Sequence, residues 1–158
     1  MRIAHAIFAG AICTAFATAS AASGPSVELP TRARGAQRIV VATVTDVQSS
    51  MSRNNFGDQV IISRLLLQIQ ETMKGQAAPA LWLDVEGGTV GNLTLRVSDM
   101  PALNQGDRAV FFTNPGPSGA DVPHLRGLGI LKLDATNRVE QESNLTLDDV
   151  RRIVEAAR

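Results

Sequence analysis

Hydrophobic and polar residues alternate along residues 59–73, near the middle of the chain. Apolar side chains occupy odd positions and polar ones most even positions: Ile61, Leu65, Leu67, Ile69 and Met73 against Arg64, Gln68, Gln70 and Thr72. A period of two is typical of a half-buried β-strand. A helix would instead place Gln68 and Gln70 beside its buried stripe. We therefore predict a long strand here and keep a helix as the alternative.

The first half of this strand carries a second apolar face, made of Val60, Ile62 and Leu66. This pattern predicts that one end of the strand is buried on both sides, while the other end faces water on one side. A strand of this length has to bend. Bent strands are typical of β-barrels and orthogonal sandwiches.

Five further segments are expected to form strands, because they alternate in hydrophobicity or are rich in β-branched and aromatic residues. They are residues 38–47, 80–86, 92–97, 108–113 and 128–133. Residues 114–126 contain three prolines and two glycines, so we expect a loop there. A closing helix is expected over residues 146–157, with Thr146 as its N-cap and one apolar stripe.

These elements predict a mainly β protein with one domain over residues 38–158. The expected fold is an OB-like β-barrel of about six mostly antiparallel strands, with a C-terminal α-helix. Residues 80–86 and 92–97 are expected to pair as a hairpin across Gly87-Gly88. That register places Arg96 opposite Trp82 and Thr94 opposite Asp84 on the outward side.

The N-terminus has the pattern of a secretory signal peptide over residues 1–22. Arg2 precedes a small apolar run at residues 7–17, and Ala19-Ser20-Ala21 then matches a small-residue cleavage site. The run is shorter than the about 20 residues that span a bilayer. Residues 23–37 are expected to be a flexible lead-in. We therefore expect a bacterial protein that is exported to the periplasm or secreted.

Cleavage of the signal peptide removes Cys13, the only cysteine, and leaves 14 basic against 15 acidic residues. This near-neutral balance gives no electrostatic footprint for nucleic acid. No second apolar segment follows the signal peptide, so we expect no membrane attachment after cleavage. With one histidine and no cysteine in the mature chain, we expect no metal site and no cofactor.

The loop at residues 114–126 holds the residues most suited to catalysis. His124 lies three residues after Asp121, with Ser118 nearby, but the surrounding sequence is not the G-x-S-x-G turn of many hydrolases. A small periplasmic hydrolase with a site in this loop is therefore one alternative. A solvent-exposed loop histidine is the simpler interpretation, and we predict no catalytic residue.

Trp82 is the residue best placed for recognition. It is the only tryptophan, and its strand alternation puts it on the same outward face as Asp84 and Glu86. With Arg96 beside it, the set forms a candidate binding patch, to which we add His124. The alternative is that the closing helix or the lead-in covers Trp82. The two acids alone have no calcium-loop spacing, so a solvated strand face explains them.

Several short motifs along residues 38–133 carry a resemblance to known proteins. They are Ile39-Val40-Val41-Ala42-Thr43-Val44, Lys74-Gly75, Val85-Glu86-Gly87-Gly88, Pro101-x4-Gly106-Asp107, Ala109-Val110-Phe111-Phe112 and Gly127-x-Gly129. In this order they resemble a group of bacterial exported β-domains, some of which lie beside matrixin-like metallopeptidase domains. The strand order is also similar to the OB-like barrel of tissue inhibitors of metalloproteinases.

This resemblance implies a barrel and does not identify functional residues. Tissue inhibitors of metalloproteinases chelate the protease zinc through an N-terminal cysteine, which the mature chain lacks. The first functional hypothesis is an exported, non-catalytic binding or accessory module that meets a protein or peptidase partner. The alternatives are the small hydrolase and a carrier that holds a small apolar ligand inside the barrel.

Overall fold

The structure, a computed structural model, describes residues 28–54 and 56–158. The signal peptide predicted at residues 1–22 therefore lies outside the described residues. The helices are α1 (Leu29–Gly35), η1 (Arg126–Gly129) and α2 (Leu147–Ala156). The strands are β1 (Arg38–Arg53), β2 (Gln59–Lys74), β3 (Ala80–Glu86), β4 (Gly88–Val90), β5 (Leu93–Leu95), β6 (Arg108–Pro115), β7 (Asp121–Pro123), β8 (Ile130–Leu133), β9 (Arg138–Val139) and β10 (Glu142–Thr146).

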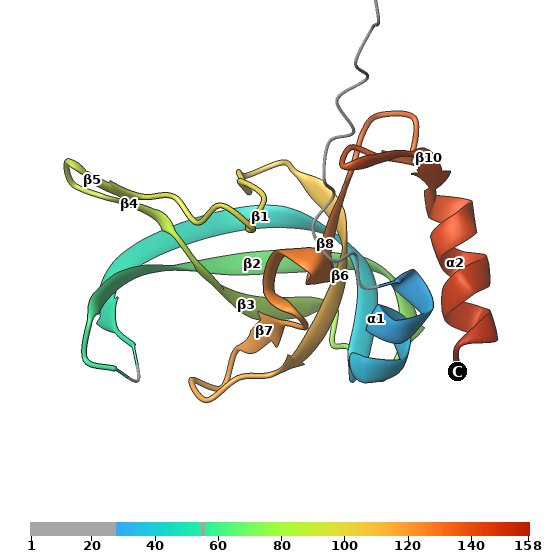
Figure 1. Ribbon diagram of the computed structural model, residues 1–158, viewed down its shortest axis with the longest axis horizontal. Coiled ribbons are helices and arrows are strands. Elements are labelled where there is room, and N and C mark those ends of the chain that lie inside the picture. Colours follow the sequence, from blue (N-terminus) through green and yellow to red (C-terminus); the bar gives the residue numbers. More distant parts are fainter. Residues whose placement is uncertain (1–27, 55) are drawn as a thin grey trace, which may run out of the picture.

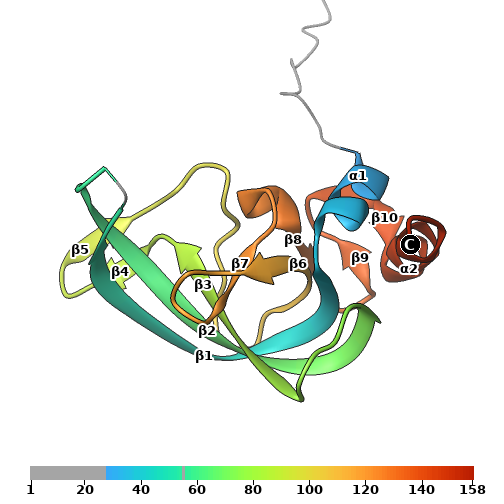
Figure 2. The same cartoon turned by 90° about the horizontal axis from the view of Figure 1, so that it is seen from below.

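The main sheet is partly closed into a ring, which confirms the OB-like barrel with a C-terminal helix (Figures 1 and 2). Its strands follow the order β1-β2-β3-β7-β6, and β6 pairs back onto β1. The β3–β7 pairing is parallel, and the other pairings around the ring are antiparallel. β8, β9 and β10 extend the sheet from β6. The described residues contain more strands than the six predicted, because short strands such as β7 lie within predicted loops.

The first part of β1, residues 39–42, and the central part of β6 are buried on both faces because each separates two clusters of core residues. Val40, Ala42 and Phe111 point into the barrel, whereas Ile39, Val41 and Phe112 point toward the two helices. Figure 1 shows α1 and α2 together at one end of the barrel, opposite the turn between β1 and β2. The unbroken apolar runs in these strands are therefore explained by burial on both sides.

The strand predicted at residues 59–73 is confirmed as β2. Ile61, Ser63, Leu65 and Leu67 are buried, whereas Ile62, Arg64 and Leu66, which alternate with them, are partly exposed. β1 and β2 each have 16 residues and pair along nearly their whole length. Register shifts in their ladder, one of them between Val44 and Asp46, mark the bulges where the pair bends.

The predicted hairpin between residues 80–86 and 92–97 is wrong. β3 pairs with β2, which places Trp82 opposite Leu66, while β4 and β5 form a separate small hairpin that places Thr94 opposite Thr89. The chain leaves the main sheet at Gly87 and Gly88, whose φ values of 107° and 134° favour glycine. A Cβ on Gly88 would overlap the Ser63 and Ser49 hydroxyls, so glycine also allows close packing there.

The flexible lead-in predicted at residues 23–37 is partly wrong, because residues 29–35 form α1. Leu29, Ala33 and Ala36 recur at helical spacing and are buried in the core cluster that α2 also joins. Pro30 lies in the first turn, where its missing N–H costs no helical hydrogen bond. The sequence analysis did not predict this helix, because arginines and small residues separate the few apolar positions of its stripe. Residues 23–27 lie outside the described residues.

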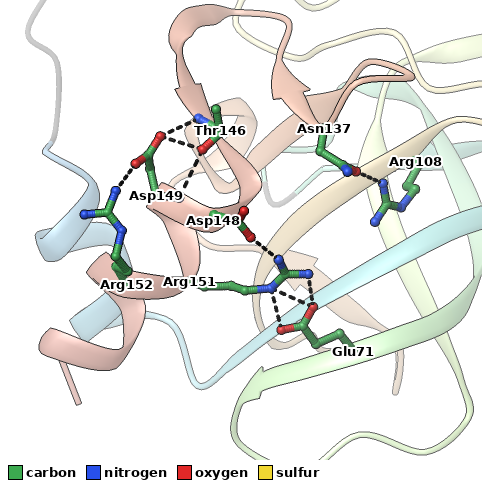
Figure 3. A network of polar contacts seen from close by, with 8 residues as sticks. All are labelled: Glu71, Arg108, Asn137, Thr146, Asp148, Asp149, Arg151 and Arg152. Atoms are coloured by element: carbon green, nitrogen blue, oxygen red, sulfur yellow. Dashed lines mark hydrogen bonds and ion pairs between the residues drawn. The ribbon is translucent and has the colours of Figure 1, made fainter.

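The closing helix is confirmed as α2, and Thr146 is its N-cap. The Thr146 hydroxyl accepts a hydrogen bond from the Asp149 N–H at 3.2 Å, and the Asp149 carboxylate accepts one from the Thr146 N–H at 2.9 Å (Figure 3). Arg151 links the helix to β2 by donating to the Glu71 carboxylate at 2.7 Å. No helix in the described part of the chain is long and apolar enough to cross a membrane.

Replacing Thr146 with alanine is expected to lower the free energy of unfolding by about 1 kcal/mol, because the first turn of α2 loses its capping group. Denaturant unfolding at neutral pH measures this loss. Thr146→Ser keeps the hydroxyl and should retain most of the stability. Equal losses in the two variants would show that the methyl group, and not the cap, stabilises this end of the helix.

Candidate functional site

The outer face of β2 and β3 carries four partly exposed apolar side chains: Val60, Ile62, Leu66 and Trp82. We call these residues the β2–β3 patch. Trp82 is 40% exposed, so no helix in the described residues covers it fully. The second apolar face predicted for β2 therefore exists, but it is only half-buried. An apolar set on a regular sheet surface is typical of a contact site rather than of a core.

An ion pair crosses the middle of the patch. Arg64 donates to both carboxylate oxygens of Asp84, at 2.7 and 2.8 Å, from the paired position on β2. The Ser118 hydroxyl, in the loop between β6 and β7, donates to the same carboxylate at 2.6 Å. The hydrogen bonds from Arg64 lower the pKa of Asp84; burial opposes this shift and Ser118 adds to it. The carboxylate is therefore ionised at neutral pH and held in one orientation.

A second charged group borders the patch at the end of β3. Arg126 donates to Glu86 at 3.1 Å and to both carboxylate oxygens of Asp99, at 2.8 and 3.2 Å. These hydrogen bonds lower the pKa of Asp99 and raise that of Arg126. One guanidinium therefore binds both acids and fixes the loop before β6 against η1.

The predicted binding residues are only partly brought together. Trp82, Asp84 and Glu86 share the outer face of β3, as predicted from alternation. Arg96 instead follows β5, on the small hairpin, and is exposed there. The structure also adds Arg64, Ser118 and Arg126; of these, the sequence analysis named only Ser118, as part of the possible catalytic loop. Arg64 had one usable signal, since it is an outward charge on a strand that could pair with Asp84.

His124 lies apart from the patch, between β7 and α1. Asn114 fixes its protonation: the Asn114 carbonyl oxygen accepts from the Gln37 N–H at 2.8 Å, so the Asn114 amide group donates to His124 Nδ1 at 3.0 Å. The ring also packs against Gly35, where a Cβ would overlap it. His124 is therefore a neutral, half-buried residue that joins α1 to β6.

Ser118, Asp121 and His124 do not form a catalytic relay. Asp121 accepts hydrogen bonds from Arg38 and Thr113, Ser118 donates to Asp84, and His124 Nδ1 is bonded to Asn114. A nucleophile needs its general base within hydrogen-bonding distance. Each of these side chains instead has its own structural partner, which removes the observation that favoured the hydrolase alternative.

The pKa of His124 is lowered, first by burial and then by the positive charge of Lys74. The unfolded chain therefore binds a proton more readily than the native protein. We expect the contribution of this residue to stability to be complete above pH about 6.5 and to fall as the pH drops below that value.

Denaturant unfolding of the native chain and of His124→Gln, measured from pH 5 to 8, tests this expectation. Glutamine accepts the Asn114 hydrogen bond but does not titrate. The difference in stability between the two proteins should therefore change below pH about 6.5 in favour of the variant. A difference that is constant across this range would contradict the lowered pKa.

The barrel interior is filled by one apolar cluster. Its buried members are Val40, Ala42, Val44, Leu65, Leu67, Leu83, Val85, Ala109, Phe111 and Ile130. Nine of these ten are at most 1% exposed, which is the close packing of a protein core. This packing counts against a carrier that holds an apolar ligand at the centre of the barrel.

Metal binding finds no support in the residues that the structure describes, where no three His, Cys, Asp or Glu side chains are grouped to hold an ion. A scan against protein-family models and a search of curated proteins gave no match to this chain. The similarity to exported β-domains and to tissue inhibitors of metalloproteinases therefore stays a prediction.

Proposed function

We propose that this chain is an exported, non-catalytic binding module that meets a protein partner through the β2–β3 patch. The observation that carries the proposal is the exposure of Trp82 beside Leu66 on a regular sheet face. Tryptophan is enriched among the residues that contribute most to protein–protein binding. Its large apolar surface is removed from water when a partner covers the patch.

The charged groups around Trp82 support a specific contact. Arg64 and Asp84 are already paired, as are Arg126 and Glu86, so these side chains lose little conformational freedom on binding. An apolar centre with a polar rim is the common anatomy of a protein interface. In OB folds, the face of the second and third strands commonly binds ligands, together with neighbouring loops. That comparison is an analogy between folds and supports the location only.

Export is part of the proposal and rests on the leader-like sequence of residues 1–22. A peptidase is the partner class that the resemblance to exported β-domains suggests. The small hydrolase and the apolar carrier are less well supported, since Ser118, Asp121 and His124 have separate partners and the barrel interior is packed.

Capture from the native envelope and culture fluid tests the proposal, with the purified chain immobilised beside two variants. Trp82→Ala removes the centre of the patch. Phe56→Ala is the matched control, because Phe56 is 90% exposed in the turn between β1 and β2, ten residues before Leu66, the residue paired with Trp82. We expect a partner that the native chain and Phe56→Ala capture and Trp82→Ala loses. Capture of the same partner by all three proteins would refute this site.

A further inference from the structure

Three neighbouring strands place one side chain each in a row across the outer face of the barrel. Asp46 on β1 is paired with Leu66 on β2, and Leu66 is paired with Trp82 on β3. Directly paired residues of antiparallel strands lie on the same face of a sheet, so all three point outward. Neighbouring strands are about 5 Å apart, so the row spans about 10 Å of the surface. The row joins the β2–β3 patch to a carboxylate on β1.

The Asp46 carboxylate is oriented by its neighbours without a cation. One of its oxygens accepts a hydrogen bond from the Val47 N–H at 2.9 Å, and the other accepts from the Gln48 side-chain amide at 2.7 Å. In the described part of the chain, no arginine or lysine forms an ion pair with Asp46. A carboxylate offers about four acceptor positions, so this one can still accept two hydrogen bonds from a partner.

The cations around the row are already used elsewhere. Arg64 and Arg126 are each bonded to carboxylates of β3. On the other side of β1, Arg108 of β6 donates to Gln70 at 2.7 Å. Asp46 is therefore a fixed negative charge at the end of an apolar row, and the cation that complements it has to come from a partner.

We propose that the partner covering the β2–β3 patch presents an arginine beside an apolar residue, an inference that rests on the function proposed above. The apolar residue covers Trp82, the methylene stem of the arginine lies on Leu66, and the guanidinium donates to Asp46. Arginine suits this row because its stem packs on apolar surface while its charged end stays polar. Its planar fork also matches both oxygens of a carboxylate.

Charge complementarity separates this occupant from the others. An acidic segment or a nucleic acid would bring a like charge to Asp46. A wholly apolar segment would remove the Asp46 carboxylate from water without supplying a cation, which is costly. A second copy of the chain would present Arg64 and Arg126, which are already bonded to carboxylates of their own chain.

Fluorescence titration with short peptides tests the proposal, because Trp82 is the only tryptophan and reports on the patch directly. The probes are acetyl-Ser-Leu-Arg-Leu-Ser-amide and the same peptide with citrulline, a neutral isostere of arginine, at the centre. We expect the arginine peptide to change the emission saturably and the citrulline peptide to bind about tenfold more weakly. No saturable change with the arginine peptide up to about 10 mM, or equal binding of the two peptides, would overturn the proposal.

The Asp46→Asn variant identifies the carboxylate that reads the charge. It should weaken the arginine peptide about tenfold and leave the citrulline peptide unchanged, so the preference for arginine disappears. Asp148→Asn is the matched control, because it removes one negative charge from α2, where the Asp148 side chain is 82% exposed and pairs with Arg151. A preference that survives Asp46→Asn, or that Asp148→Asn abolishes equally, would contradict the assignment.

Capture of the native partner separates this proposal from the proposed function. Capture that is weakened by both Trp82→Ala and Asp46→Asn supports the two together. Capture that needs Trp82 but is unchanged in Asp46→Asn would keep the patch as the binding site and reject the arginine contact. Capture that does not need Trp82 would refute both. Trp82 emission that changes with protein concentration alone would place a second copy on the patch and would also reject the arginine contact.

Discussion

Replacing Phe112 with alanine is expected to lower the free energy of unfolding by about 3–5 kcal/mol. Phe112 is fully buried in β6 and packs in the cluster that joins the barrel to α1 and α2. Removing the ring deletes apolar contacts and leaves a cavity that the paired strands on either side of β6 cannot close. A loss of this size is a large part of the total stability of a domain.

Denaturant unfolding monitored by circular dichroism measures the loss, and Phe56→Ala is its control. Phe56 is the same residue type but is 90% exposed, so its replacement should change stability by no more than about 0.5 kcal/mol. A Phe112→Ala protein that is as stable as Phe56→Ala would contradict the burial of β6 between two clusters.

The Trp82→Ala substitution is expected to weaken binding of the captured partner about 30-fold or more, which corresponds to a loss of at least about 2 kcal/mol. The reason is that the indole is the largest apolar group on the β2–β3 patch and lies among already paired charges. Equilibrium affinities for the native chain, Trp82→Ala and Phe56→Ala measure the effect.

Stability must be followed in the same samples. Since Trp82 is partly exposed, its removal should leave the unfolding free energy within about 1 kcal/mol of the native value. A 30-fold loss of affinity together with unchanged stability assigns the effect to the interface. Affinities of Trp82→Ala and Phe56→Ala that agree within threefold would show that the patch is not the binding surface.

Local patterns predicted those elements whose burial follows a simple period. β2 alternates because one face lines the barrel, and α2 begins directly after Thr146 because the threonine side chain caps its first turn. The alternation of β3 likewise predicted that Trp82, Asp84 and Glu86 share an outward face. In each case the physical cause, burial of one face or capping of one helix end, acts within one element. It can therefore be recognised from neighbouring residues in the sequence.

The pairing of strands could not be predicted from local patterns in the sequence. The apolar faces of residues 80–86 and 92–97 match each other, but the alternation of β3 also matches β2. The structure pairs β3 with β2, and Gly88 then lies close to Ser63. The short apolar stripe of α1 is buried because α2, more than a hundred residues later in the sequence, packs in the same core cluster. The sequence of α1 alone does not show this contact.

The sequence analysis did not place Ser118 and Arg126 in the candidate site, because their contacts also depend on strand pairing. Ser118 is 34 residues from Asp84, and Arg126 is 40 residues from Glu86. These contacts exist because β7 pairs in parallel with β3 and brings the neighbouring loops beside it. No local pattern in the sequence predicts that β3 pairs with β7.

Site-specific photo-crosslinking tests the proposed interface most directly. A photoreactive phenylalanine analogue is placed at position 82 or, in a second protein, at position 56, and each protein is irradiated in the native envelope extract. The β2–β3 patch predicts a crosslinked partner from position 82 and none from position 56. A crosslink from position 56 alone would contradict the proposed interface and place binding at the turn between β1 and β2.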